Sequence, residues 1–432
     1  MYYLSGLFSI AKFRTRSFLV SALLICFYSL SNASSLDLGS EYRLRGLSYS
    51  NLDYVESTGD SSNFYSHRLR IYLIGSPLDN FEIITRIQAV GIAAGTTPTS
   101  RYPDADFNPW IENIYFTLKD VFSLPLDLSV GKQPFKYGQG LIVSDDNLGF
   151  TGIKLKYSYP WKNLTSELFT AKISESQAKE GDYDIHGLVT ILPGTVNTWQ
   201  LGLFFEKDKS SGTIVGVNPA SYSKKYFIDL LVEGKMEGAF YSGEVVLQKG
   251  NAELIDPDLV DPNYDSMAYL FEGGYFGYSD RLGRLEIKAT YGEGDGDNAG
   301  TPDKIESFEP GLGHKFDGLE RVGYGDFYAA TLYDVFQGLN PGYSGLQIIG
   351  FGGSIAPWVK SNLYVNYLLY KAKEAPSGGA KNLGNELDFG GNYLYSSYLN
   401  FKASIALFFP GDATQIVGSR ATRIMLETEV KF

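Results

Sequence analysis

The end of the chain alternates between mainly apolar and mainly polar positions, and this period of two constrains the fold more than any other feature. Over residues 422–432, one face of an extended strand presents Ile424, Leu426, Thr428, Val430 and Phe432. The other face presents Arg423, Glu427, Glu429 and Lys431. Because strand side chains point alternately to two faces, this pattern predicts a sheet with one apolar and one polar face.

Segments with the same alternation recur along the chain, close to the ~9–11 residues that a tilted membrane strand needs. They fall near residues 36–50, 64–74, 81–91, 110–118, 126–133, 150–157, 164–172, 183–191, 198–206, 225–234, 240–248, 267–276, 284–292, 345–355, 362–372, 384–394, 399–409 and 422–432. Short connectors alternate with long polar ones. We therefore expect an all-β fold: a transmembrane antiparallel β-barrel of about 18 strands, with 16 as the alternative count, long extracellular loops and short periplasmic turns.

The first 33 residues have the pattern that is typical of a secretory signal peptide. Lys12, Arg14 and Arg16 precede an apolar stretch over residues 18–30 that is too short to span a bilayer, and Ala33 ends a small-residue cleavage site. We expect residues 34–432 to form a single barrel domain in the outer membrane. Its partners would be outer-membrane lipid and the barrel-assembly machinery, with Phe432 as the assembly signal.

Composition excludes several other classes of protein. The chain of 432 residues has a net charge of −12, which argues against nucleic acid as a partner. Its single cysteine, Cys26, lies in the expected signal peptide, so disulfide frameworks, zinc fingers and iron–sulfur clusters are ruled out. We expect no cofactor.

Three stretches carry a resemblance to a known family. Gly131–Gly140 (GKQPFKYGQG), leading to Gly152, resembles a motif of the alginate-export family of outer-membrane barrels. Gly292–Asn298 with 308–315 (FEPGLGHK), and Gly384–Phe389 with Leu407–Asp412, are similar to later motifs of that family in the same order. The resemblance implies an eighteen-stranded barrel that passes an anionic polyuronate through a basic constriction. Lys132 stands where the family has arginine, and Thr151 stands where it has aspartate.

The phase of each strand predicts which charges face the lumen. A charge that faces lipid near the midplane costs about 2–4 kcal/mol, so the apolar face is assigned to lipid. The predicted basic lining comprises Arg43, Arg45, Arg68, Arg70, Arg86, Lys132, Lys154 and Lys156. The predicted acidic lining, in the second half, comprises Asp229, Glu233, Glu244, Glu272, Glu286, Glu386 and Asp388. Three interpretations stay open: charges that pair and brace a hydrated wall, an anion-selective pore, and a polyuronate track.

The sequence gives little support for a catalytic site or a metal site. None of the three histidines, His67, His186 and His314, has a serine at an informative spacing, so we expect no enzyme. We expect His67 to face lipid and His186 to face the lumen. The aspartates Asp295 and Asp297, and the group Asp256, Asp258, Asp261 and Asp265, are weak candidates for calcium, although solvated acidic loops explain them better. The tryptophans Trp110, Trp161, Trp199 and Trp358 lie near strand ends, where an interfacial aromatic girdle explains them.

Together these features predict a channel for the passive diffusion of hydrophilic solutes, with anionic saccharides or small anions favoured. The alternatives are a general porin without anion preference and a non-conducting surface barrel that serves as an adhesin or scaffold. We expect the long connector over about residues 293–344 to restrict the pore by folding inward against a basic wall, because connectors of such length are usually functional or disordered.

Overall fold

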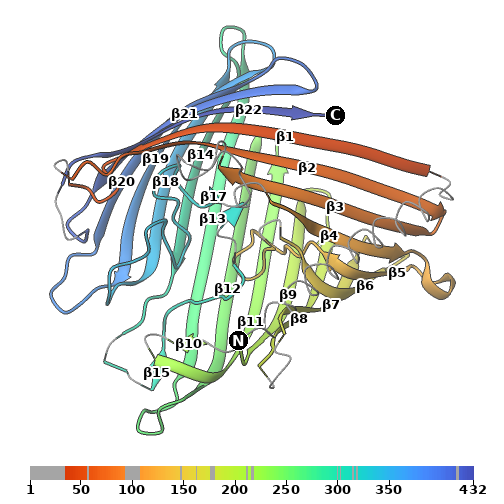
Figure 1. Ribbon diagram of the computed structural model, residues 1–432, viewed down its shortest axis with the longest axis horizontal. Helices are drawn as coiled ribbons and strands as arrows, with labels where there is room; N and C mark the ends of the chain where they lie inside the picture. Colours follow the sequence, from red (N-terminus) through yellow and green to blue (C-terminus); the bar gives the residue numbers. More distant parts are fainter. Residues whose placement is uncertain are drawn as a thin grey trace, which may run out of the picture.

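Eighteen long strands close into an antiparallel barrel in the computed structural model (Figure 1). The structure describes residues 35–55, 58–92, 108–145, 148–161, 163–175, 181–210, 213–215, 218–298, 300–301, 303–313, 316–317, 320–414 and 418–432. The expected signal peptide and His314 lie outside these residues. No helix among the described residues is long and apolar enough to cross a membrane.

The barrel strands follow one another around the wall in chain order. The first nine are β1 (Ser35–Ser50), β2 (Ser62–Leu78), β3 (Phe81–Ile92), β4 (Asn108–Leu118), β5 (Leu126–Gln133), β6 (Phe150–Ser158), β7 (Thr165–Ser174), β8 (Tyr183–Pro193) and β9 (Asn197–Asp208). The second nine are β11 (Asn218–Met236), β12 (Ala239–Leu254), β13 (Asn263–Ser279), β14 (Gly283–Gly294), β18 (Ser344–Ala356), β19 (Ser361–Glu374), β20 (Asn382–Leu394), β21 (Leu399–Pro410) and β22 (Ala421–Lys431). Pairing of β1 with β22 closes the ring, which removes the exposed sheet edges that lipid would not tolerate.

Short elements lie in the connections. These are the 3₁₀ turn η1 (Val121–Ser123) and the two-residue strands β10 (Ile214–Val215), β15 (Lys304–Ile305), β16 (Phe316–Asp317) and β17 (Glu320–Arg321). Connections at one end of the barrel are short, as between β2 and β3 or β11 and β12, and those at the other end are long. Each predicted alternating segment coincides with a barrel strand, so the prediction of eighteen strands is confirmed.

The two faces of the wall differ as a membrane barrel requires. On β1 the apolar Leu38 is 70% exposed, whereas Glu41 and Arg43, on the opposite face, are 6% and 3% exposed. Exposed apolar side chains continue around the outside, for example Ile228 on β11 and Leu426 on β22. This arrangement is the reverse of a soluble β-protein and matches an apolar, lipid-facing outer surface.

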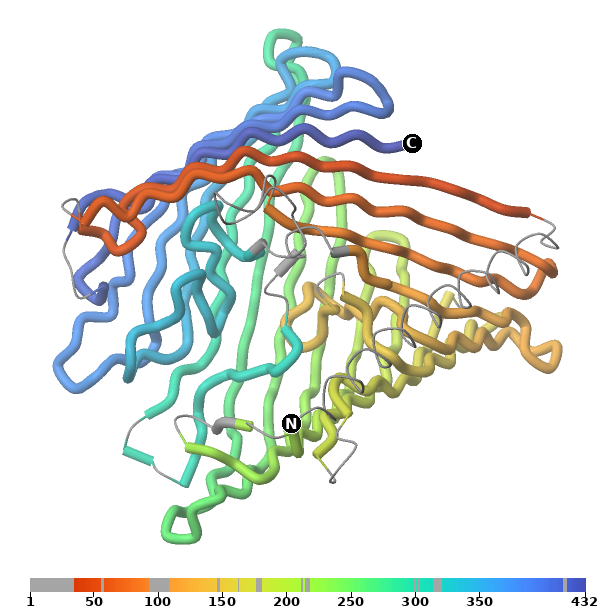
Figure 2. The backbone as a smooth tube through the Cα atoms, viewed as in Figure 1, coloured from red at the N-terminus to blue at the C-terminus, as the bar shows by residue number. Residues whose placement is uncertain are grey.

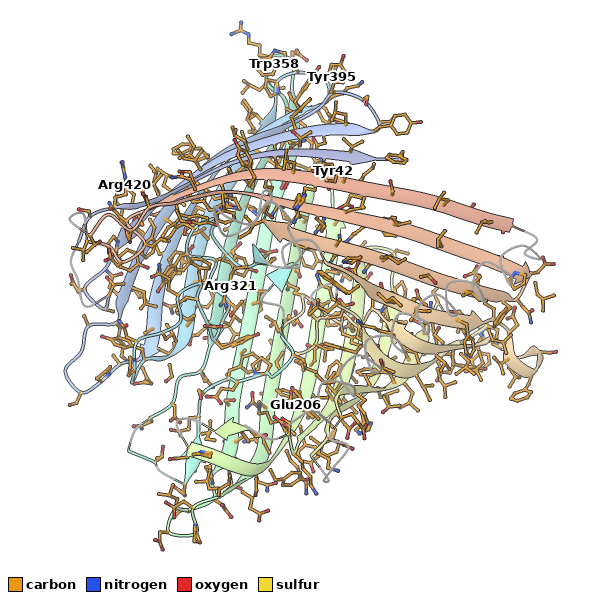
Figure 3. The ribbon with its side chains drawn as sticks, viewed as in Figure 1. Tyr42, Glu206, Arg321, Trp358, Tyr395 and Arg420 are labelled. Atoms are coloured by element: carbon orange, nitrogen blue, oxygen red, sulfur yellow. The ribbon has the colours of Figure 1, made fainter. Side chains whose placement is uncertain are left out.

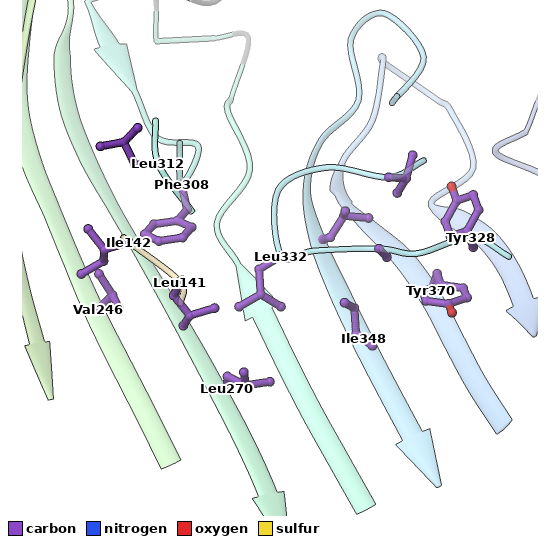
Figure 4. Close-up of a cluster of buried hydrophobic side chains, with 14 of the residues drawn as sticks. Leu141, Ile142, Val246, Leu270, Phe308, Leu312, Tyr328, Leu332, Ile348 and Tyr370 are labelled. Atoms are coloured by element: carbon purple, nitrogen blue, oxygen red, sulfur yellow. The ribbon is translucent and has the colours of Figure 1, made fainter. Parts of the chain in front are cut away.

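The hydrophobic core lies inside the barrel, where two connections fold inward. We name residues 134–145 the first inner loop, and residues 303–313 with 320–343 the second inner loop. Figure 2 shows the second inner loop within the ring of strands. In Figure 4, Leu141, Phe308 and Leu332 of these loops pack near Leu270 and Ile348 of the wall. The expectation that the long connector folds inward therefore agrees with the structure.

Candidate functional site

Five arginines form a ladder on the inner face of β1, β2 and β3. The register places Arg43 opposite Arg68, and one step further along places Glu41 opposite Arg70. Arg45 lies two residues from Arg43 along β1, on the side away from Glu41. Arg86 lies opposite Tyr72, which is two residues beyond Arg70 along β2. Successive rows on one face are about 6.6–6.8 Å apart, so the ladder spans about 20 Å of wall. We call Arg43, Arg45, Arg68, Arg70 and Arg86 the arginine ladder.

Among the described residues, three carboxylates lie between cations of the arginine ladder and its neighbours. Glu41 Oε1 lies 2.5 Å from Arg68 Nη2 and 3.8 Å from Arg70 Nη1. Glu112 Oε1 lies 2.7 Å from Arg86 Nη2 and 3.3 Å from Arg70 Nη2. Glu427 of β22 pairs with Arg45 and also lies 2.7 Å from Lys402 of β21. Each of these three carboxylates lies within ion-pair distance of two cations, and Glu429, opposite Arg43 in the register, is a fourth acid on this wall.

Exposure divides the ladder into two groups. Arg43, Arg68 and Arg70 are buried, whereas the side chains of Arg45 and Arg86 retain 16% and 19% of their surface. The buried group braces the wall, as the pairing interpretation expects. Arg45 and Arg86 are therefore the two members of the ladder whose side chains keep more than a tenth of their surface exposed.

Sequence reasoning missed Glu112, the most deeply buried acid of this cluster. Simple alternation on β4 puts Glu112 in phase with the outward Ile114 and Phe116. A bulge changes the phase, because Arg86 pairs with Asn113 while Ile87 pairs with Ile111. The extra residue turns Glu112 inward. The signal was present in the sequence, since a glutamate among lipid-facing residues is costly enough to indicate an irregularity.

The three predicted lysines lie apart from the ladder. Lys154 faces inward beneath the first inner loop, with its Nζ 4.3 Å from the centre of the Phe135 ring and 3.6 Å from Glu167 Oε1. Lys156 is exposed on the same inner face, opposite Asp127 and Glu167. Lys132 is different: it pairs with Ile114 and Thr151 on the outward phase, and its Nζ donates to the Ile111 carbonyl over 2.8 Å. The structure does not place Lys132 in the lumen.

The second inner loop is held by carboxylates of the wall. The backbone N–H groups of Phe327 and Tyr328 donate to Glu386 over 2.6 and 2.9 Å, and Gly311 N–H donates to Glu206 over 3.2 Å. Figure 3 shows Arg321 of this loop inside the ring of strands. The expectation of a basic wall beneath the loop holds only in part: Lys225 donates to the Glu309 carbonyl over 2.8 Å and Arg423 lies 3.8 Å from Asp326, but wall acids hold the backbone amides of the loop. The loop also reaches β1, where Phe336 stacks on Tyr49 at 6.1 Å.

The first inner loop, formed by the GKQPFKYGQG stretch, uses the same principle. Gln139 N–H donates to Glu244 Oε2 over 2.8 Å, and Tyr137 stacks on Phe169 with ring centres 4.9 Å apart. Gly138 has a φ of +57°, and a Cβ at this position would overlap the Glu244 carboxylate. Glycine is required here both for the backbone conformation and for the close approach.

The other predicted lumen acids also lie inside the barrel. Asp229 accepts from Gln200 over 3.2 Å, Glu272 accepts from Thr290 over 3.2 Å, and Asp388 accepts from Asp326 N–H over 3.3 Å. Glu233 is exposed on the inner phase, and Glu286 pairs with Arg284 at 2.9 Å. Because Glu206, Glu244, Glu386 and Asp388 accept loop amides, part of this acidic arc is covered rather than bare.

Two aromatic side chains differ from expectation. His186 is exposed on the outer face, where it stacks on Phe205 of β9 with ring centres 5.9 Å apart, so the expectation that it faces the lumen is wrong. His67 lies opposite Leu44 on the outward phase, as expected. Trp110 lies opposite the buried, inward Gln88 and does not belong to an interfacial girdle, whereas Trp161, Trp199 and Trp358 are exposed.

The acidic candidates for calcium serve as backbone caps. Asp295 Oδ2 accepts from Met267 N–H over 2.8 Å, and Asp297 Oδ1 accepts from Glu306 N–H over 3.0 Å. Burial raises the pKa of the Asp295 carboxyl, which works against its holding a cation in the anionic form. Asp261 and Asp256 accept backbone N–H groups in the β12–β13 connection, and Asp265 pairs with Lys249. Within the described ranges no group of three or more histidines, cysteines or acids is placed to hold a metal ion.

Solved structures share this architecture. The chain is similar to OccAB2 of Acinetobacter baumannii, with a TM-score of 0.57, 13% identity, and coverage of 93% of this chain and 99% of that chain. It is similar to the outer membrane protein OpdK of Pseudomonas aeruginosa, with a TM-score of 0.54, 11% identity and coverage of 92% and 99%. It is also similar to OccK2 (OpdF) of P. aeruginosa in complex with glucuronate, with a TM-score of 0.55, 12% identity and coverage of 93% and 98%.

The fold is that of an outer-membrane β-barrel. No protein-family model and no curated protein matches the chain. The resemblance to the alginate-export family is therefore still a prediction. What the comparisons support is a barrel of the outer membrane, in agreement with the expected location.

Proposed function

We propose that this barrel is an outer-membrane channel for small hydrophilic solutes, with a preference for organic anions that carry a carboxylate. The observation that carries the proposal is the shared pairing in the arginine ladder, where Glu41, Glu112 and Glu427 each lie between two cations. A solute carboxylate can then replace part of a shared ion pair. Arginine suits this role because it stays charged and offers a planar fork of donors to carboxylates.

The similar structure of OccK2 with glucuronate supports the choice of substrate class, since glucuronate is a uronic acid with one carboxylate. The positions of Arg45 and Arg86 favour them as contact residues, because both keep exposed surface in the lumen. Lys156, which is also exposed on the inner face, is a second contact for the same anion.

The test measures ion selectivity in planar bilayers. We expect the double variant Arg45→Gln, Arg86→Gln to shift the reversal potential in a KCl gradient toward cations and to weaken block by glucuronate. Glu112→Gln should act in the opposite direction, because it frees Arg70 and Arg86 from their shared carboxylate. A matched control is Lys235→Gln, Arg281→Gln, which removes the same charge at exposed positions in and beside the short turns.

The two alternatives give different results in the same experiment. A general porin would conduct but keep its selectivity in all three variants, which would show that the arginines only brace the wall. A non-conducting surface barrel would show no channels at all with the unaltered protein. The second alternative has a structural basis, because the two inner loops fill part of the lumen and could close it to solutes.

A further inference from the structure

The outer face of β8, β9 and β11 carries a row of stacked aromatic rings. His186, Phe205 and Tyr226 lie opposite one another in the register, and their ring centres are 5.9 Å and 4.9 Å apart. The apolar Leu203 and Ile228 lie next to this row on the side of the short turns. Because aromatic side chains gather where the hydrocarbon meets the headgroups, this row marks the outer interface of the membrane.

The next register row, toward the long loops, is polar and basic. It runs across β7, β8, β9, β11, β12 and β13 through Lys172, Asp184, Lys207, Lys224, Asn251 and Asn263. A row two residues beyond the aromatic rings lies about 6.6–6.8 Å further along the strands. These side chains therefore lie at the level of the lipid headgroups.

Two lysines in this row oppose each other. Lys207 of β9 lies directly opposite Lys224 of β11, an arrangement that is unfavourable for two like charges. The neighbouring Asp184 pairs with Lys172 at 3.5 Å, and Lys172 also pairs with Asp182 at 2.7 Å. Asp184 is therefore paired with Lys172 and not with Lys207 or Lys224. Among the described residues, neither Lys207 nor Lys224 has an ion-pair partner.

Further features extend the basic site. The Nζ of Lys224 lies 4.7 Å from the centre of the Tyr222 ring, and the Nζ of Lys209 lies 5.4 Å from the same ring, so one tyrosine gathers two cations. A hollow of about 560 Å³ begins at Asn251, opposite Lys224; it is lined by Tyr226, Lys249, Asn251 and Asn263 and also by the acids Glu253 and Asp261. Its lining offers amide and hydroxyl groups that suit a sugar headgroup.

We infer that the outer face at Lys207 and Lys224 binds a phosphorylated glycolipid of the outer leaflet. A phosphate would lie between the two ammonium groups and relieve their repulsion, the sugar would lie toward the hollow beside Tyr226, and the acyl chains would cover the apolar surface of Leu203 and Ile228. The lysine pair, the hollow and the apolar surface thus correspond to the phosphate, the sugar and the acyl chains of such a lipid. This inference requires the outer-membrane location but does not depend on which solute the channel conducts.

The test measures binding of bisphosphorylated lipid A to the purified barrel in detergent micelles, by native mass spectrometry and by titration with a fluorescent derivative. The variant Lys207→Gln, Lys224→Gln should bind roughly 30-fold more weakly, as expected for two basic residues beside an anionic lipid. Fully dephosphorylated lipid A should bind the unaltered protein and this variant equally. Inorganic phosphate at about 10 mM should fail to displace the lipid, which separates a lipid site from a phosphate site.

Control variants keep the inference falsifiable. Lys235→Gln, Lys360→Gln removes two exposed lysines at the opposite end of the barrel and should leave binding unchanged. Without lipid, the Lys207→Gln, Lys224→Gln barrel should resist heat at least as well as the unaltered one, since a like-charge contact is removed. Unchanged lipid A binding in that variant would overturn the inference, and so would an equal loss in the control. A barrel that conducts with unaltered selectivity but has lost lipid binding would separate this site from the proposed channel.

Discussion

Glu386 shows how one side chain can hold a loop that folds into the barrel. Its two carboxylate oxygens accept from the N–H groups of Phe327 and Tyr328, and the Tyr370 hydroxyl donates to it over 3.2 Å. Glu386 is fully buried, so no water replaces a lost partner cheaply. The contact is therefore a point at which the second inner loop can be released by a single substitution.

We expect Glu386→Gln to loosen the second inner loop. A glutamine has one acceptor oxygen, so one of the two backbone N–H groups would face an amide donor, at a cost of about 1.5–3 kcal/mol. The expected result is larger current noise and higher mean conductance in single-channel recordings, with a lower temperature of unfolding on gels. Glu253→Gln, at an exposed position, is the matched control. Currents that stay as quiet as those of the unaltered channel would show that other contacts hold the loop.

Gly138 offers a second residue-scale prediction, on the first inner loop. Because its φ is +57° and a Cβ would overlap Glu244, Gly138→Ala should displace either the loop or the carboxylate. We expect a loss of about 1–3 kcal/mol in stability. The measurement is heat-modifiability on gels in parallel with Gly378→Ala, whose positive φ is similar but whose Cβ would have open space around it. An equal loss in the two variants would assign the effect to backbone strain alone.

Particular residues show how far alternation can predict a pore wall. The phases of Arg68, Arg70 and Arg86 follow directly from their apolar neighbours, because a membrane leaves little freedom to a charged side chain. Glu112 could not be placed in this way, since a bulge changes the phase of the strand. His186 was misplaced for a different reason: near the interface an aromatic imidazole is tolerated on either face.

At the scale of elements, the strands were predictable, whereas for the loops only the inward fold of the long connector was. Each strand is fixed by its own pattern of apolar residues, whereas the inner loops are held by contacts between residues far apart in the chain, such as Gln139 with Glu244. The β11 strand begins at Asn218, several residues before its alternating segment, because its extracellular end carries polar residues beyond the apolar band. Local patterns therefore predict the wall, and the contents of the lumen require the structure.

Removing the second inner loop should widen the pore. We expect replacement of residues 320–340 by a short glycine–serine linker to raise single-channel conductance, because this segment packs inside the barrel against Tyr370 and Phe408. The two strands on either side of the loop, β14 and β18, pair directly with each other, so the barrel does not need the loop for closure. Deleting residues 256–260 from the exposed β12–β13 connection is the control. Equal conductance in the two deletions would place the restriction elsewhere.

The last strand allows a test that separates the predicted assembly role of Phe432 from barrel closure. Phe432 closes on β1 through its backbone, with Ser40 N–H donating to its carbonyl over 2.6 Å and its own N–H donating to Ser40 over 3.0 Å. Its side chain is 74% exposed, so it adds little to packing inside the protein. We expect Phe432→Ala to fold as well as the unaltered chain in detergent but to give a lower folded yield in cells. Equal yields in cells would contradict an assembly role for the ring.

At the scale of the whole molecule, the sign of the net charge and the sign of the ladder oppose each other. The chain carries −12, and many of its exposed acids, such as Asp256 and Asp258, lie in the connections between strands. The ladder lies inside the wall, with Arg43, Arg68 and Arg70 largely out of contact with solvent. Salt acts more strongly on the exposed charges than on partly buried ones.

This difference predicts an unusual salt dependence of selectivity. At low salt the acidic exterior attracts cations to the mouth of the channel and offsets the ladder. At about 1 M salt the screening length falls to about 3 Å. The exposed acids then no longer attract cations to the mouth of the channel, whereas the partly buried arginines still act on ions at contact distance. We expect the preference for chloride over potassium, measured from reversal potentials at a fixed gradient ratio, to grow as salt rises. The Arg45→Gln, Arg86→Gln variant should instead approach no preference, and a chloride preference that decays with salt in the unaltered channel would show that the ladder does not set selectivity.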